Sequence, residues 1–260
     1  MRIVIKVGTS TLAHANGRLN IRRVELLCKV LSDMKNAGCE IVLVSSGAIG
    51  MGVGKLGLPG RPEDMPGKQA AAAIGQCELM YTYDKLFAEY NHTVAQILLT
   101  ADDIADKRRS SYVHDTLERL LSWGVLPIVN ENDAVAIDEI GIHTTIGEND
   151  SLSAVVAKLV GADLLVLLSD IDGLYTADPR KDPDATLIPE VKQITPEILA
   201  LAGAAGTSLG SGGMATKLKA AQIATDAGID MVIANGESPE NMYALLEGKN
   251  IGTRFIGRSI

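Results

Sequence analysis

The chain has 260 residues, of which 47% are apolar and 22% charged, and its formal net charge at pH 7 is −8. The acidic balance argues against nucleic acid as a main partner, because phosphate backbones attract clustered Lys and Arg. The three cysteines lack CxxC spacing, and no apolar run approaches the roughly 18 residues of a membrane span. We therefore expect a cytoplasmic protein with reduced thiols and no membrane segment.

Apolar runs alternate with helical patterns along the whole chain. The runs predict strands over residues 3–7, 41–45, 94–99, 126–130, 164–168 and 231–234, and the patterns predict helices over 21–37, 69–90, 111–123, 151–160, 213–227 and 239–247. Continuous Val, Ile and Leu runs are typical of parallel strands covered on both faces. We predict an α/β fold, a three-layer αβα sandwich with a mainly parallel central sheet, in which residues 1–260 form a single domain.

Two local features refine this prediction. Asn20 and Gly38 flank the first helix and are suited to cap its two ends. Short β-like segments around residues 139–146 and 185–194 interrupt the alternation, and we expect them to form hairpins beside the main sheet.

Two lysines next to glycines indicate an anion site. Lys217 ends the glycine-rich segment 206–217 where a helical pattern begins, and the first strand runs into Lys6 and Gly8. Glycines let the backbone approach a ligand closely, and the free N–H groups of a helix N-terminus bind anions. Because a lysine at a buried strand end needs an anion to face, Lys6 and Lys217 are predicted to hold one transferring phosphoryl group from both sides.

Polar clusters follow four of the predicted strands, at residues 6–10, 45–50, 130–133 and 169–173. In open parallel sheets, ligands bind beyond the carboxyl ends of the strands. The shared placement of these clusters predicts a single site at that edge.

Simpler interpretations compete with these motifs. Residues 52–57 match the GxGxxG spacing of dinucleotide sites, but Pro59 and Pro62 follow at once, so we interpret the segment as a glycine-rich loop. The cluster at 130–133 also suits a turn, and Asn149 or Asp150 also suits a helix N-cap. The four histidines have no metal-ligand spacing, so they predict no zinc site.

Six motifs occur in order over essentially the whole chain: Val4-Ile-Lys-Val-Gly-Thr-Ser10, Ser45-Ser-Gly-Ala-Ile49, Asn130-Glu-Asn-Asp133, Gly147-Glu-Asn-Asp150-Ser-Leu-Ser153, Gly173-Leu-Tyr-Thr-Ala-Asp-Pro-Arg180 and Gly210-Ser-Gly-Gly-Met-Ala-Thr-Lys217. Together they resemble the amino acid kinase family, and within it the branch that phosphorylates glutamate. The first and third motifs separate this branch from the aspartate, acetylglutamate and UMP kinases. Glu148, Ser169 and Ser211 depart conservatively from the family pattern and remove no charge that matters here.

The resemblance implies ATP and Mg²⁺ as cofactors, with transfer of the γ-phosphoryl group to the side-chain carboxylate of L-glutamate as the first step of proline biosynthesis. It implies catalytic roles for Lys6, Lys217 and Asp150, with Asp150 orienting the two lysines, and it leaves the metal ligands unassigned. The implied glutamate ligands are Ser46, Asp133 and Asn149, and the implied ATP ligands are Lys6, Ser169, Asp170, Ser211, Gly212, Gly213, Met214, Ala215, Thr216 and Lys217.

Two alternatives stay open. One is another carboxylate kinase of the same fold, such as an acetylglutamate kinase. The other is an inactive amino-acid sensor, which would keep Ser46 and Asp133 but lose a lysine. The resemblance further implies a homo-oligomer with proline as a feedback inhibitor. Many bacterial members carry a C-terminal RNA-binding-like domain, which we expect this chain of 260 residues to lack.

Overall fold

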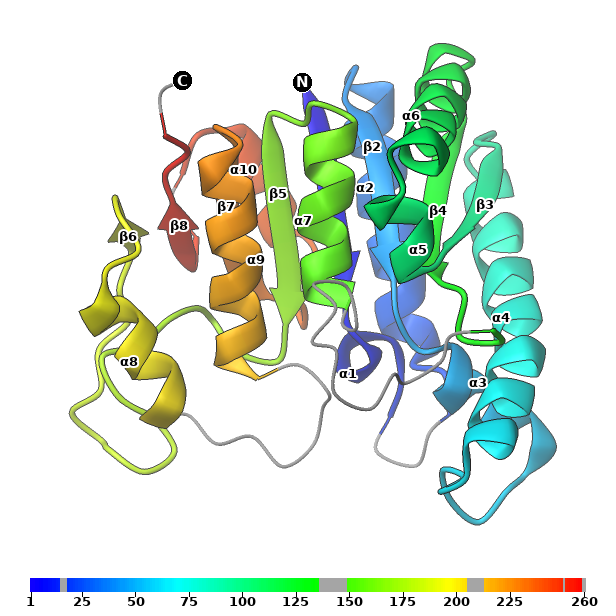
Figure 1. The fold of residues 1–260 in the computed structure, drawn as a ribbon, viewed down its shortest axis with the longest axis horizontal. Helices are drawn as coiled ribbons and strands as arrows, with labels where there is room; N and C mark the ends of the chain where they lie inside the picture. Colours follow the sequence, from blue (N-terminus) through cyan, green and yellow to red (C-terminus); the bar gives the residue numbers. More distant parts are fainter. Residues whose placement is uncertain (15–17, 136–148, 205–212, 250, 259–260) are drawn as a thin grey trace.

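The computed structural model describes residues 1–14, 18–135, 149–204, 213–249 and 251–258. In this part of the chain, eight strands form one sheet in the order β3-β4-β2-β1-β5-β7-β8-β6 (Figure 1). All neighbours pair in parallel except β7 and β8, so the predicted, mainly parallel sheet is confirmed. The strands are β1 (Arg2–Val7), β2 (Glu40–Ser45), β3 (Val94–Leu99), β4 (Leu126–Glu131), β5 (Leu164–Ser169), β6 (Glu190–Val191), β7 (Asp230–Asn235) and β8 (Thr253–Phe255).

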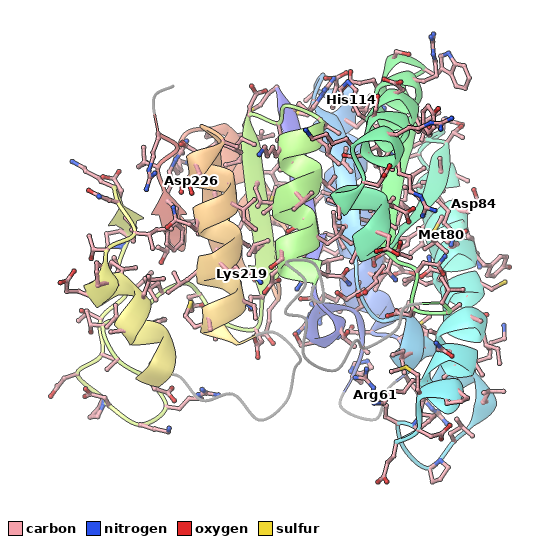
Figure 2. All side chains as sticks on the ribbon, in the orientation of Figure 1. Arg61, Met80, Asp84, His114, Lys219 and Asp226 are labelled. Atoms are coloured by element: carbon pink, nitrogen blue, oxygen red, sulfur yellow. The ribbon has the colours of Figure 1, made fainter. Side chains whose placement is uncertain are left out.

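Helices cover both faces of the sheet. The helices of the described residues are α1 (Thr9–Leu12), α2 (Ile21–Asn36), α3 (Ala48–Leu56), α4 (Met65–Ala88), α5 (Ala101–Ala105), α6 (Lys107–Ser122), α7 (Asn149–Leu159), α8 (Pro196–Ala204), α9 (Met214–Asp226) and α10 (Asn241–Leu246). Two apolar clusters fill the spaces between the layers, one beneath α2, α4 and α10 and the other beneath α6, α7 and α9. His114 on α6 (Figure 2) links this helix to α7, because its Nδ1 donates to the carbonyl oxygen of Leu159, the last residue of α7, at 2.8 Å. The chain is thus a three-layer αβα sandwich.

The alternation of side chains along a strand decides which face each polar residue occupies. On β1, Ile3 and Ile5 pack into the cluster beneath α2 and α4, whereas Val4 packs into the opposite cluster. Lys6 has the parity of Val4 and so lies on the side of α7 and α9. On β4, Ile128 packs into the cluster beneath α4, which puts Asn130 on the side of that helix.

Capping at both ends of α2 follows the sequence. The Asn20 side chain accepts a hydrogen bond from the N–H of Arg23, and Gly38 takes a positive φ of 95° just after the helix. These contacts confirm the predicted helix ends. Two other helices start earlier than predicted, α4 at Met65 and α6 at Lys107, because Asp64 and Asp106 accept from backbone N–H groups there and act as N-caps.

The structure corrects several predictions. Residues 52–57 are not a glycine-rich loop, because most of this segment lies in α3, which ends before Gly57. Segment 185–194 is not a hairpin beside the sheet: it makes one antiparallel bridge, Tyr175 to Leu187, and then enters the sheet as β6, parallel to β8. The segment expected at 139–146 lies outside the described residues. Helices α1, α5 and α8 and strand β8 have no counterpart among the predicted elements.

Glycine in α3 and α4 permits a very close helix contact. A Cβ on Gly52 would stand 1.9 Å from the carbonyl oxygen of Ala71, and one on Gly75 would stand 1.7 Å from the carbonyl oxygen of Ala48. Backbone atoms cannot turn away as a flexible side chain can. Gly52, one of the glycines that suggested a loop, therefore holds α3 against α4 together with Gly75, beside the carboxyl end of β2.

Gly75→Ala is expected to destabilise the protein by at least about 1–3 kcal/mol, because the added methyl group overpacks a backbone contact. For a chain of this size, each kcal/mol lowers Tm by about 2–4 °C. Thermal unfolding checks this, with Gly60→Ala as the control because a Cβ on Gly60 meets no atom within 4 Å. Equal Tm values for the two variants would contradict the packing role of Gly75.

Candidate active site

The predicted site residues gather at the carboxyl end of the parallel sheet. The order of the central strands is β4, β2, β1 and β5, so Asn130, Ser46, Lys6 and Ser169 follow one another across this edge. Strand β1 pairs with β2, the next strand in sequence, on one side and with β5 on the other. The strand order therefore changes direction at β1. Ligands bind where a strand order reverses in this way. Lys6 therefore stands at the centre of the site.

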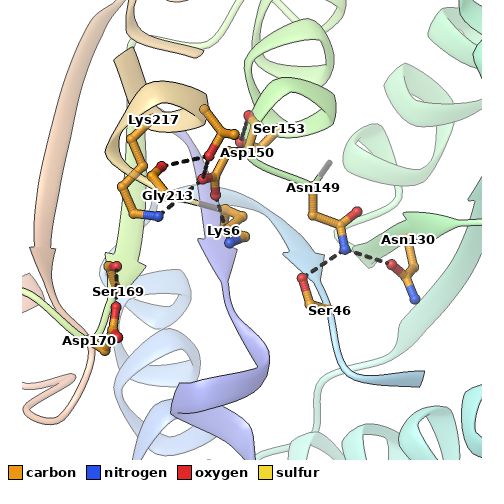
Figure 3. A network of polar contacts seen from close by, with 11 residues as sticks. Lys6, Ser46, Asn130, Asn149, Asp150, Ser153, Ser169, Asp170, Gly213 and Lys217 are labelled. Carbon is orange, nitrogen blue, oxygen red and sulfur yellow. Dashed lines mark hydrogen bonds and ion pairs between the residues drawn. The ribbon is translucent and has the colours of Figure 1, made fainter. Parts of the chain in front are cut away.

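A buried carboxylate joins the two lysines. Lys6 Nζ lies 2.6 Å from Asp150 Oδ1, and Lys217 Nζ donates to Asp150 Oδ2 at 3.2 Å (Figure 3). The Thr216 hydroxyl also donates to Asp150 Oδ2, at 2.9 Å. The Asp150 side chain is 1% exposed, and the lysine side chains are 12% and 7% exposed. Residues from β1, α7 and α9 thus form one ionic cluster, which we call the lysine–aspartate cluster.

The charges of the cluster decide the ionisation of Asp150. Burial raises the pKa of this carboxyl group. The charges of Lys6 and Lys217 and the hydrogen bonds from Lys6 and Thr216 lower that pKa, and together they outweigh the effect of burial. The pKa of Asp150 therefore lies below its ordinary value. At neutral pH the cluster holds one carboxylate and two cationic side chains, which leaves net positive charge for an anionic ligand.

A second polar group lies on the other side of Lys6. Asn149 Nδ2 donates to Ser46 Oγ at 2.7 Å and to Asn130 Oδ1 at 3.1 Å (Figure 3). Asn130 Nδ2 in turn donates to Gln76 Oε1 on α4 at 2.9 Å. We call these residues the amide chain. Because Asn149 and Asp150 are neighbours in the first turn of α7, that turn joins the amide chain to the lysine–aspartate cluster.

Residues expected to bind ATP lie on the β5 side of Lys6. Ser169 ends β5, and its hydroxyl donates to Asp170 Oδ1 at 3.1 Å. Gly213 is the N-cap of α9, and no side chain caps this helix end. The N-terminus of α9 lies next to the lysine–aspartate cluster, because Thr216 and Lys217 in its first turn contact Asp150. In the first turn of α9, Met214 is buried and Ala215 is exposed. Ser211 and Gly212 lie outside the described residues.

Asp133, expected to bind glutamate, lies in a turn just after β4 and is half-buried. Gln76 is the residue that sequence reasoning missed. It lies on the apolar face of α4 with Ala72, Leu79, Tyr83 and Phe87, and it is 8% exposed. A glutamine within an apolar helix stripe is the sequence signal that could have identified it.

Two negative findings concern the described residues. They include no group of three or more His, Cys, Asp and Glu placed to hold a metal ion. None of their helices has the length and apolar character to cross a membrane.

Comparison with known proteins gives the same family. The model of the amino acid kinase family matches residues 1–235. The chain is 55% identical to the glutamate 5-kinase of Clostridium perfringens over 257 residues, which cover 99% of this chain and 96% of that protein. It is 52% identical to the glutamate 5-kinase of Listeria monocytogenes over 257 residues, which cover 99% of this chain and 93% of that protein.

Two solved structures share the fold. The carbamate kinase from Giardia lamblia bound to AMP-PNP has a TM-score of 0.68 at 21% identity. The match covers 99% of this chain and 98% of the carbamate kinase chain. The isopentenyl phosphate kinase from T. acidophilum, in a product complex, has a TM-score of 0.66 at 20% identity. The match covers 98% of this chain and 100% of the isopentenyl phosphate kinase chain. These matches agree with the parallel sheet and its helical layers, and with the six sequence motifs. The chain belongs to the amino acid kinase family.

Proposed function

We propose that the chain transfers the γ-phosphoryl group of ATP to the γ-carboxylate of L-glutamate, giving γ-glutamyl phosphate and ADP as the first step of proline biosynthesis. The observation that carries the proposal is the position of the lysine–aspartate cluster between the Ser46–Asn149 pair and the Ser169 end of β5. The names of the relatives in Clostridium and Listeria support the same substrate.

The reaction needs alignment more than proton transfer. A glutamate carboxylate has a pKa near 4.3 and is already ionised at pH 7, so it attacks phosphorus without a general base. One carboxylate oxygen forms a bond to the γ-phosphorus, and the bond from that phosphorus to the β–γ bridging oxygen breaks, releasing ADP. Charge spreads over the equatorial oxygens during transfer. In the proposal, Lys6 and Lys217 stabilise that charge, and Asp150 fixes both ammonium groups beforehand.

The division of the remaining residues follows from the strand order. In the proposal, Ser46, Asp133 and Asn149 bind glutamate on the β2 and β4 side. Ser169, Asp170 and residues 211–217 bind ATP on the β5 side, with the N–H groups at the start of α9 directed to phosphate oxygens.

Mg²⁺ is proposed as the partner of ATP rather than as a metal bound by side chains. The described residues offer no cluster of three ligands, and both oxygens of Asp150 already face lysines. Mg²⁺ in kinase sites is bound largely by substrate phosphates and water. We therefore assign no side chain to the metal and no step of the reaction to it.

The inactive sensor is disfavoured by the lysine–aspartate cluster. A sensor needs to bind the amino acid but has no need for two cations paired on one buried carboxylate beside the proposed ATP side. Assembly into a homo-oligomer, inhibition by proline, a cytoplasmic location and a single domain over residues 1–260 stay predictions.

The wild-type protein is expected to prefer L-glutamate to N-acetyl-L-glutamate by about two orders of magnitude or more in kcat/KM. An acetylated amine has no charge and adds bulk, so it loses the attraction of a carboxylate such as Asp133. Asp133→Ala should raise the KM for glutamate with a smaller effect on kcat. ADP release measured with both substrates checks this, and an equal or reversed preference would favour the acetylglutamate kinase alternative.

A further inference from the structure

Gln76 is the buried end of the amide chain, and hydrogen-bond chemistry fixes the direction of every amide in it. The N–H of Glu131 donates to Asn130 Oδ1 at 2.9 Å, and a backbone N–H can only donate. The atom of Asn130 that faces Glu131 is therefore the oxygen, and its NH₂ group must face an acceptor. Gln76 Oε1 is that acceptor, at 2.9 Å.

The same logic determines the orientation of Asn149. Because Asn130 Oδ1 is an acceptor, the atom of Asn149 that lies 3.1 Å from it must be the NH₂ nitrogen, which also donates to Ser46 Oγ. The other end of the Asn149 amide, Oδ1, is buried and has no hydrogen-bond partner in the structure. A buried acceptor without a donor costs about 1–3 kcal/mol, so this atom is expected to meet a donor on the ligand.

Glutamate offers one kind of donor at neutral pH. Both of its carboxylates are ionised and only accept, so the α-ammonium group is its sole donor. We propose that Gln76 is a positioning residue for recognition of the substrate α-ammonium group: its side-chain oxygen holds Asn130, which turns Asn149 so that Oδ1 faces the substrate. This inference rests on the proposed function, and Gln76 acts through Asn130 and Asn149 without touching the reacting atoms.

Removal of the Gln76 oxygen would leave the Asn130 NH₂ group buried without its acceptor. Without that acceptor the Asn130 side chain is no longer held in place. Asn149, which donates to Asn130 Oδ1, then loses its fixed orientation, so its own Oδ1 no longer faces the substrate. The lysine–aspartate cluster includes no atom of the amide chain, so phosphoryl transfer itself should be little affected.

Gln76→Met tests the proposal because methionine keeps the length and burial of the side chain but removes its acceptor. We expect the KM for glutamate to rise about ten- to a hundredfold, with kcat and the KM for ATP changed by less than about threefold. Calorimetric binding of glutamate and of glutarate, which lacks the α-ammonium group, supplies the specific readout. The variant should lose affinity for glutamate about ten- to a hundredfold and keep the wild-type affinity for glutarate.

Two further variants make the test decisive. Gln222→Met on α9, a partly buried glutamine outside the amide chain, should keep both affinities. Gln76→Glu retains an oxygen opposite Asn130 and should recover most of the preference for glutamate, even if its Tm falls. Equal losses for the two ligands in Gln76→Met, or an unchanged preference for glutamate, would overturn the role of Gln76 while leaving the proposed function intact. Wild-type protein that fails to phosphorylate glutamate would instead overturn the proposed function and this inference with it.

Discussion

Lys6→Ala and Lys217→Ala are each expected to lower kcat about 10²- to 10³-fold, with much smaller changes in the KM values for ATP and glutamate. A preorganised donor aimed at charge that develops in the transition state contributes about 3–4 kcal/mol. Both ammonium groups are fixed on one carboxylate, at 2.6 and 3.2 Å, and are mostly buried. Their loss therefore removes charge stabilisation made mainly in the transition state, which appears in kcat.

Steady-state kinetics of the two variants check this prediction. Lys219→Ala is the matched control, because Lys219 lies on α9 two residues beyond Lys217 but is exposed (Figure 2). The control should retain wild-type kcat. Near-normal turnover in either Lys6→Ala or Lys217→Ala would remove that lysine from the mechanism.

Asp150→Asn is expected to lower both activity and stability. The substitution keeps the shape of the side chain but leaves two largely buried ammonium groups without their shared anion. Removing one partner of a buried ionic group costs about 3–5 kcal/mol, so Tm should fall by on the order of 10 °C. Turnover should fall as well, because repulsion drives the two lysines apart. Asp115→Asn, at an exposed position of α6, is the control and should change neither quantity.

The stability difference between wild type and Asp150→Asn should depend on pH in one direction. The pKa of Asp150 in the folded protein is below the ordinary value of about 3.9. Its contribution is therefore fully present above that ordinary value and is lost as the pH falls through the lower, folded-state pKa. Thermal unfolding should show a constant difference from about pH 8 to pH 5 that shrinks only below about pH 4. A difference that vanished near neutral pH would contradict the ionised cluster.

Much of the fold could be predicted from the sequence because its central strands are local apolar runs. The six predicted strands correspond to β1, β2, β3, β4, β5 and β7. Strand β8 was missed, and β6 was expected only as part of a hairpin, because these strands have three and two residues and depend on pairing between distant segments. Helix α3 was missed because its glycines have low helix propensity, and packing against α4 overrides that preference.

The site was predictable only in part, for a related reason. Lys6 and Lys217 stand out in sequence because each adjoins glycines and ends or opens an element. Their common partner, Asp150, could be assigned from the family motif, and the structure brings it into contact with both. The contact of Gln76 with Asn130 joins residues that are 54 positions apart, and no local pattern specifies it. Helix periodicity places Gln76 on the buried face but does not say which polar group it meets.

Trapping of the acyl phosphate tests the proposed reaction most directly. The wild-type protein is incubated with ATP, Mg²⁺, L-glutamate and hydroxylamine, which converts γ-glutamyl phosphate to γ-glutamyl hydroxamate and phosphate. We expect hydroxamate and ADP in equal amounts, dependent on glutamate and formed about 10²- to 10³-fold more slowly by the Lys217→Ala variant. Release of ADP without hydroxamate, or hydroxamate formed only from N-acetyl-L-glutamate, would contradict the transfer of phosphate to glutamate at this site.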